Sequence, residues 1–167
     1  MRIKIVFDAN NASIPFNHQH LVTGIIHKWL GKENNLHGNI SLYSFSRLEG
    51  AKPAKDKLKF EQFGSFFFSA HDPEVINLLM KGIFNDKTMF CGLEVCEICV
   101  VKEPDFVDTA YFNVGSPILI KRYADKGVKH YIYTDEQANE LLKETLLSKM
   151  KIAGLEDDSL DIQFDLS

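Results

Sequence analysis

The stretch that decides the fold is residues 2–31, RIKIVFDANNASIPFNHQHLVTGIIHKWLG. Its opening alternates the apolar Ile3, Ile5 and Phe7 with basic residues, which is typical of a β-strand with one buried face. From position 17 the apolar residues recur at helical spacing before a glycine. They are Leu21, Val22, Ile25, Ile26, Trp29 and Leu30. The chain is therefore predicted to begin with a strand followed by an amphipathic helix.

Two more strands are predicted after this helix. Residues 40–45 and 65–69 are rich in apolar and aromatic side chains, and the second of them contains the run Phe66, Phe67, Phe68. Between these segments, residues 47–59 are polar and basic and include Gly50 and Pro53, which predicts a long loop.

A second helix and a final strand complete the first predicted domain. Asp72 followed by Pro73 is typical of a helix start, because aspartate caps the first turn and proline suits the first helical position. Residues 88–101 predict a strand with a break at Gly92. The order is then β-α-β-β-α-β, which is the ferredoxin-like order of an α+β domain.

A second series of predicted strands and a helix begins after Pro104. The elements expected there are strands at 111–120, 130–133 and 160–164 and a helix at 135–150. A complete ferredoxin-like domain needs one more helix and a closing strand. We therefore expect an N-terminal ferredoxin-like domain over residues 1–104 and a second, incomplete ferredoxin-like domain over residues 105–167.

Composition favours a soluble, cytoplasmic protein. Of the 167 residues 45% are hydrophobic, which suffices for a core. The sequence has neither an apolar run long enough to cross a bilayer nor an N-terminal secretion signal, so no membrane association is expected. Its three cysteines, crowded between Cys91 and Cys99, argue against a disulfide framework. The net charge of −4 argues against a general positive field, although basic residues concentrate between Arg47 and Lys59.

Histidines provide the candidate chemistry. At helical spacing His27 projects away from the apolar stripe of the first helix, and His20 lies on the same outward face. His37 follows in the turn before the next strand. Because a histidine titrates near neutral pH, His27 and His37 together could supply a base and an acid for RNA cleavage by its own 2′-hydroxyl. Solvated surface histidines are the simpler interpretation.

A metal site is the rival interpretation, and the spacing disfavours it. His20 and His27 lie roughly 10 Å apart along a helix, which is too far for a shared zinc ion. Cys96 and Cys99 form a CxxC that would point to opposite faces of a strand, and no second pair completes four ligands. We therefore expect no metal and no cofactor.

Several segments resemble CRISPR-associated endoribonucleases that process repeat RNA. The stretch from Ile14 to His27 is similar to the start of that family, and residues 42–46 are similar to its second strand. Residues 66–73 resemble its third strand and the start of its second helix. Gly115 to Ile118 resembles the opening of its second domain. The similarity extends over nearly the whole chain.

This resemblance implies two ferredoxin-like domains that bind a CRISPR repeat and cut it without a metal ion, leaving a 2′,3′-cyclic phosphate. The family's catalytic histidine matches His37, and a tyrosine or histidine on the first helix matches His27. His37 would be the base and His27 the acid, or the reverse. The RNA-contacting residues expected are His20, Lys28, Lys32, Lys52 and Lys55. CRISPR repeat RNA is the expected partner, with other CRISPR-associated proteins as further partners.

Two features depart from the family. A lysine that some relatives have just before the second strand falls near Ser41 here, with Lys28 or Lys32 as substitutes. The family's glycine-rich C-terminal loop has no counterpart in the sequence up to Ser167. A non-catalytic RNA-binding or assembly subunit of the same fold is therefore the alternative function, and a protein-interaction module is a third. An exposed sheet edge would also allow a homodimer.

Overall fold

The computed structural model describes residues 1–31, 41–103, 105, 109–115, 118–124, 127–155, 157 and 159–165. The chain divides into two compact units, Met1–Gly115 and Ser116–Ser167. The domain boundary expected between residues 104 and 105 stays a prediction.

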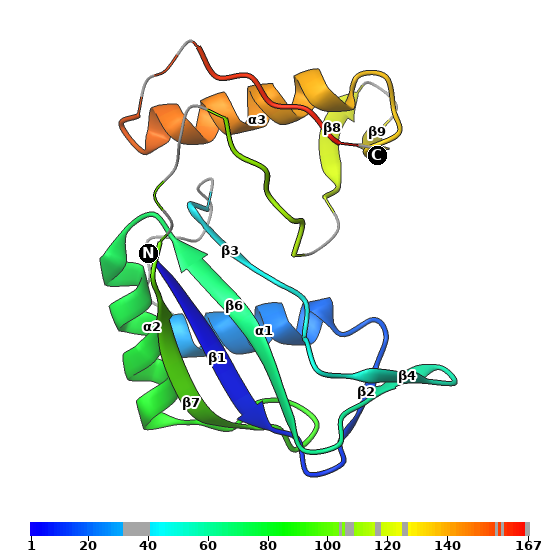
Figure 1. Ribbon diagram of the computed structural model, residues 1–167, viewed down its shortest axis with the longest axis vertical. Helices are drawn as coiled ribbons and strands as arrows, with labels where there is room; N and C mark the ends of the chain where they lie inside the picture. The colour runs from blue at the N-terminus through cyan, green and yellow to red at the C-terminus, as the bar shows by residue number, and fades with distance from the viewer. Residues whose placement is uncertain are drawn as a thin grey trace. The chain divides into compact units, whose positions relative to one another are not determined.

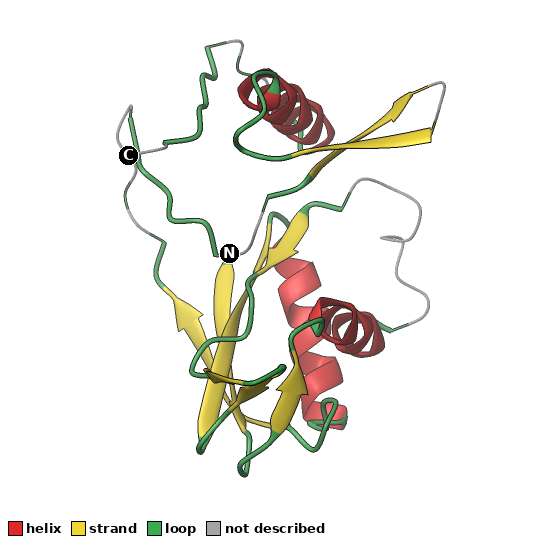
Figure 2. Ribbon diagram, turned by 90° about the vertical axis from the view of Figure 1, so that its right-hand side faces the viewer, coloured by secondary structure: helices red, strands yellow, loops and turns green. Residues whose placement is uncertain are grey.

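The first unit is built on a four-stranded antiparallel sheet with the strand order β3-β6-β1-β7. Its strands are β1 (Arg2–Asp8), β3 (Tyr43–Phe45), β6 (Phe63–Ala70) and β7 (Glu94–Val101). The helices α1 (Gln19–Leu30) and α2 (Pro73–Asn85) both cover one face of this sheet (Figures 1 and 2). The expected ferredoxin-like order is confirmed.

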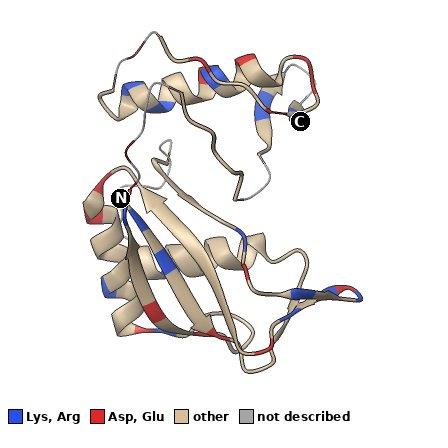
Figure 3. Ribbon diagram, viewed as in Figure 1, with Lys and Arg blue, Asp and Glu red and all other residues tan. Residues whose placement is uncertain are grey.

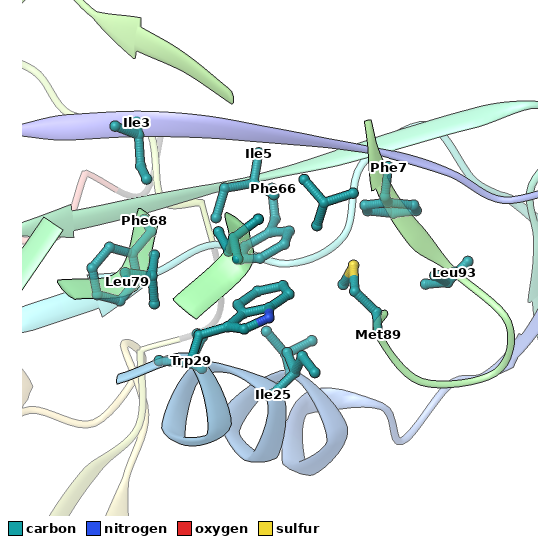
Figure 4. Packing of buried hydrophobic residues seen from close by; sticks show 14 of the residues in the cluster. Ile3, Ile5, Phe7, Ile25, Trp29, Phe66, Phe68, Leu79, Met89 and Leu93 are labelled. Atoms are coloured by element: carbon teal, nitrogen blue, oxygen red, sulfur yellow. The ribbon is translucent and has the colours of Figure 1, made fainter. Parts of the chain in front are cut away.

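The core lies between the sheet and its two helices (Figure 4). Strand β1 contributes Ile3, Ile5 and Phe7, which are fully buried because successive side chains of a strand point to opposite faces. Strand β6 contributes Phe66 and Phe68 in the same way. Each large side chain that is fully buried contributes about 1.5–3 kcal/mol to folding. The apolar alternation of the sequence thus fixes which face of the sheet meets the helices.

Helix α2 begins as the sequence predicts. The Asp72 carboxylate accepts a hydrogen bond of 2.9 Å from the backbone N–H of Glu74, and Pro73 occupies the first turn. These two residues satisfy or remove donors that a helix start leaves without partners. The predicted cap is confirmed.

Helices α1 and α2 meet closely at Gly82. A side-chain carbon at this position would lie 2.6 Å from the Cα of Trp29 and closer still to its carbonyl oxygen. The Trp29 indole Nε1 also donates a hydrogen bond of 2.8 Å to the backbone oxygen of Asp86, just after α2. Only glycine allows this backbone-to-backbone approach.

The prediction of a loop over residues 47–59 is wrong in part. Strands β4 (Lys52–Ala54) and β5 (Lys57–Lys59) form a hairpin, and β5 also pairs with β2 (Ser13–Pro15) in a second, three-stranded sheet. Strand β2 buries Ile14 opposite Leu58. Because this pairing joins segments far apart in the sequence, local composition does not reveal it.

Two predicted strands are shorter in the structure. Strand β3 begins at Tyr43, and residue 40 lies outside the described residues. The strand expected from position 88 begins at Glu94, because Cys91 and Gly92 adopt positive φ angles of 53° and 78° in a turn. The N–H of Met89 closes this turn with a hydrogen bond of 2.9 Å to the carbonyl of Leu93.

The second unit contains a hairpin and a helix among its described residues. These elements are β8 (Ile120–Ala124), β9 (Gly127–Tyr131) and α3 (Ala138–Ile152). The Arg122 guanidinium joins hairpin and helix, because its Nη2 donates hydrogen bonds to the Leu141 carbonyl at 2.8 Å and to Glu144 at 3.1 Å. The helix expected at 135–150 is present, but it begins at Ala138 and ends at Ile152.

Three strand predictions for the second half fail to match the structure. The described residues from 111 to 119 are not in a strand, and β8 begins only at Ile120. Strand β9 overlaps the segment expected at 130–133 but ends at Tyr131. Residues 160–164 form no strand, and there the Phe164 N–H donates instead to the side chain of Asn139 at 2.9 Å. Apolar spacing in short segments does not separate strand from extended loop.

None of the helices within the described ranges is long and apolar enough to cross a membrane.

Candidate functional site

The structure places His27 against Tyr43. The Tyr43 hydroxyl lies 3.4 Å from Nε2 of His27, so helix α1 and strand β3 meet through these two polar side chains. His27 is half-buried rather than fully outward, because the edge strand β3 flanks α1 at this point. A polar pair is thus formed at the edge of the apolar core.

The core holds the Tyr43 ring in place. Tyr43 pairs with Ala70 of β6, and its ring stacks on Phe68 with 5.5 Å between ring centroids and 28° between ring planes. Phe68 is fully buried and therefore fixed. Stacking of this kind leaves the hydroxyl at the rim of the core, where it reaches the imidazole.

Partial burial raises the pKa of the Tyr43 hydroxyl above its usual value, because the ionised form would lose solvation. The hydroxyl therefore keeps its proton at neutral pH and can donate a hydrogen bond. An imidazole nitrogen without a proton is a good acceptor for it.

Two of the expected site residues, His37 and Lys32, lie outside the described residues. Their roles stay predictions.

Lys28 is engaged in a structural contact. Its Nζ forms an ion pair with Asp86 and donates a hydrogen bond of 3.1 Å to the Thr88 carbonyl, which links α1 to the segment after α2. The hydrogen bond from Lys28 is the main reason why the pKa of the Asp86 carboxyl is lowered. To bind RNA, Lys28 must either break its ion pair with Asp86 or contact the RNA and Asp86 at the same time.

The other expected RNA contacts are exposed and lie apart along the fold. His20 is in the first turn of α1. Lys52 is on β4, where it forms an ion pair of 2.7 Å with Glu61, while Lys55 is in the turn after it with a φ of 55°. Lys52 therefore belongs to the second sheet, whereas Tyr43 belongs to the four-stranded sheet.

Three residues escaped the sequence analysis as candidates: Tyr43, Arg2 and Lys4. Arg2 and Lys4 share the sheet face opposite the helices with Phe67. Phe67 belongs to the phenylalanine run, for which the sequence allows base stacking as the alternative to core packing. Strand alternation could have separated Phe67 from its two buried neighbours. The contact between Tyr43 and His27 left no sequence signal, because it joins a strand to a preceding helix.

A metal site has no support among the described residues, which contain no group of three or more histidine, cysteine, aspartate or glutamate side chains able to hold an ion. The pair of His27 and Tyr43 can instead orient an imidazole and exchange protons.

The fold defines the class of protein to which the chain is similar. No family model and no curated protein sequence matches it. Solved structures do match it over almost its whole length, and they are CRISPR-associated Cas6 and RAMP proteins.

Three of these structures are informative. One described as "CRISPR associated protein Cas6" is 21% identical with a TM-score of 0.78, covering 99% of this chain and 76% of that one. A Cas6-related protein from Pyrococcus furiosus is 22% identical with a TM-score of 0.79, covering 95% of this chain and 73% of that one. The third, "An RAMP protein binding different RNA substrates", is 20% identical with a TM-score of 0.80, covering 95% and 74%. The chain therefore has the fold of these proteins.

Proposed function

We propose that this protein is a metal-independent endoribonuclease that binds and cleaves CRISPR repeat RNA. The observation that carries the proposal is the likeness to Cas6 structures, which extends over 95–99% of the chain. The second support is His27, a titratable side chain held by Tyr43 at the rim of the core.

The reaction needs one base and one acid. The base takes the proton of a 2′-hydroxyl, whose oxygen attacks the adjacent phosphorus while the bond from phosphorus to the 5′-oxygen breaks. The acid gives its proton to that leaving oxygen, so the products are a 2′,3′-cyclic phosphate and a 5′-hydroxyl. His37 is assigned as base and His27 as acid, and no metal takes part in either transfer.

The first test is incubation of the chain with repeat RNA from its own genome in EDTA. Products are resolved on a denaturing gel, and their 3′ ends are examined for a cyclic phosphate. Discrete cleavage that ends in a cyclic phosphate is the expected result. Intact RNA after saturating binding would refute catalysis.

A non-catalytic RNA-binding subunit is the second candidate function. The observation that favours it is the similarity to an RAMP protein whose description mentions binding of different RNA substrates. Binding of repeat RNA without cleavage, weakened steeply by salt, would distinguish this function, because phosphate contacts release counterions.

Replacement of Tyr43 by phenylalanine should slow cleavage about three- to tenfold, which is the scale of one neutral hydrogen bond. The ring still stacks on Phe68, so the fold and RNA affinity should not change. Single-turnover rates measure the effect, with Tyr131→Phe in the second unit as the matched control. Equal rates in Tyr43→Phe and wild-type protein would exclude Tyr43 from the mechanism.

The same variant has a readout that does not require activity. If the Tyr43 hydroxyl donates to Nε2 of His27, the neutral imidazole carries its proton on Nδ1. The ¹⁵N chemical shifts of His27 should therefore indicate the Nδ1–H form in wild-type protein and move toward the Nε2–H form in Tyr43→Phe. Identical shifts in the two proteins would contradict this orientation.

A further inference from the structure

Phe67 is the residue of the run Phe66, Phe67, Phe68 whose side chain is not part of the buried core. Phe66 and Phe68 are fully buried beneath the helices, whereas Phe67 is only half-buried and points to the opposite face of the sheet. Neither α1 nor α2 lies on this face (Figure 2). Its aromatic ring is therefore available to something other than the core.

Two cations lie over the ring. Lys4 pairs directly with Phe67 across β1 and β6, and its Nζ lies 5.9 Å from the ring centroid. The guanidinium carbon of Arg2 lies 5.6 Å from the same centroid. Arg2 is also fixed, because its Nε donates a hydrogen bond of 2.9 Å to the Ser69 hydroxyl. We call Arg2, Lys4 and Phe67 the sheet-face cluster.

The basic and acidic side chains of this face lie toward opposite ends of strand β1. The basic side chains stand near the start of β1, whereas its other end pairs Asp8 with Glu94, and Val6 lies opposite Glu97 (Figure 3). A polyanion that touches this face is thus attracted to the sheet-face cluster and repelled from the acidic end. Such a gradient would orient the bound chain.

We propose that the sheet-face cluster binds an unpaired segment of single-stranded RNA, with one base stacked at Phe67 and adjacent phosphates held by Arg2 and Lys4. Aromatic rings on a sheet offer a stacking surface for any base, and neighbouring cations track the backbone. Phe67 has no hydrogen-bonding group, so this contact favours single strands without reading their sequence. That the segment belongs to a CRISPR repeat rests on the proposed function.

The binding test uses a fluorescein-labelled oligouridylate and the full chain, with affinity measured by anisotropy. Phe67→Ala should weaken binding at least about fivefold, the low end of what one stacked base contributes. Phe63→Ala is the matched control, since Phe63 lies on the same strand and face but pairs with Asp8 at the acidic end. Equal affinity of the two variants would overturn the proposal.

A second variant guards against loss of folding. Phe67→Leu keeps an apolar side chain on the sheet but removes the ring, so it should also weaken binding at least about threefold while its circular dichroism stays native. Wild-type affinity in a folded Phe67→Leu protein would equally overturn the proposal.

The charge component has its own test. Lys4→Gln should lower the slope of log affinity against log salt by about 0.7, the value for one phosphate contact to a single strand. Lys81→Gln is the control, because Lys81 is an exposed residue of α2, a helix on the other face of the sheet. An unchanged slope in Lys4→Gln would remove Lys4 from the site.

Ultraviolet crosslinking separates this inference from the proposed function. Oligouridylate should crosslink to Phe67, and His27→Ala should leave the crosslink intact because it affects only cleavage. A protein that crosslinks at Phe67 but never cuts repeat RNA would retain the RNA site and lose the enzyme assignment. A protein that cuts repeat RNA while Phe67→Ala binds normally would retain the enzyme and lose the site.

Discussion

His37→Ala is expected to lower the rate of repeat-RNA cleavage at least about a hundredfold, the usual contribution of one acid–base group. Affinity for the RNA should stay nearly unchanged, since the imidazole acts on protons in the transition state rather than on binding. Single-turnover rates at saturating protein measure the loss, and equilibrium titration measures affinity. His130→Ala, an exposed histidine of β9, is the matched control.

The pH dependence assigns the two roles. A base must be deprotonated, so the rate rises with pH until the base has lost its proton, and an acid must be protonated, so the rate falls again at higher pH. If His37 is the base, His37→Ala loses the rising limb and His27→Ala loses the falling limb. The opposite pattern would reverse the assignment.

The double variant provides a further control. Two residues that act in one proton-transfer unit are strongly non-additive, so His27→Ala combined with His37→Ala should be only slightly slower than the slower single variant. A wild-type rate in His37→Ala would exclude this histidine altogether.

Gly82→Ala is expected to destabilise the first unit by about 3 kcal/mol or more, at the upper end of overpacking effects. The added methyl group would collide with the backbone of Trp29, and backbone atoms do not move aside as a flexible side chain does. Helices α1 and α2 would have to separate, which opens the core they share.

Trp29 reports this change directly. It is the protein's only tryptophan and lies in the core at the contact with Gly82, so its fluorescence during urea unfolding follows the first unit. Gly24→Ala is the matched control in α1, where nothing lies within 4 Å of the added carbon. That variant should stabilise the protein by up to about 1 kcal/mol through helix propensity. Equal midpoints for the two variants would contradict the close contact.

Much of the fold was predictable because it is encoded locally. The alternation in β1, the helical stripe around Ile25 and the Asp72 cap each depend on neighbours a few residues away. These patterns correctly predicted the β-α-β-β-α-β order. They failed where a segment is short and its partner distant, as in the pairing of β2 with β5.

The candidate site was predictable only in part. Helical spacing predicted that His27 projects away from the apolar stripe of α1. That His27 is half-buried follows from its contact with Tyr43 on the edge strand β3. Lys28 was expected to contact RNA, and the structure shows it bound to Asp86. A charged residue on a helix gives no local sign of the partner that the next helix supplies.

The sequence by itself determined the order of the two helices and four main strands of the first unit, and it determined which faces of β1 and α1 turn inward. Only the tertiary structure decided that Tyr43 meets His27, that Trp29 meets Gly82 and that Phe67 stands beside Arg2 and Lys4. The reason is physical: periodicity sets the direction of a side chain along its own element. The neighbour it reaches depends on strand register and helix packing, which join segments far apart in the chain.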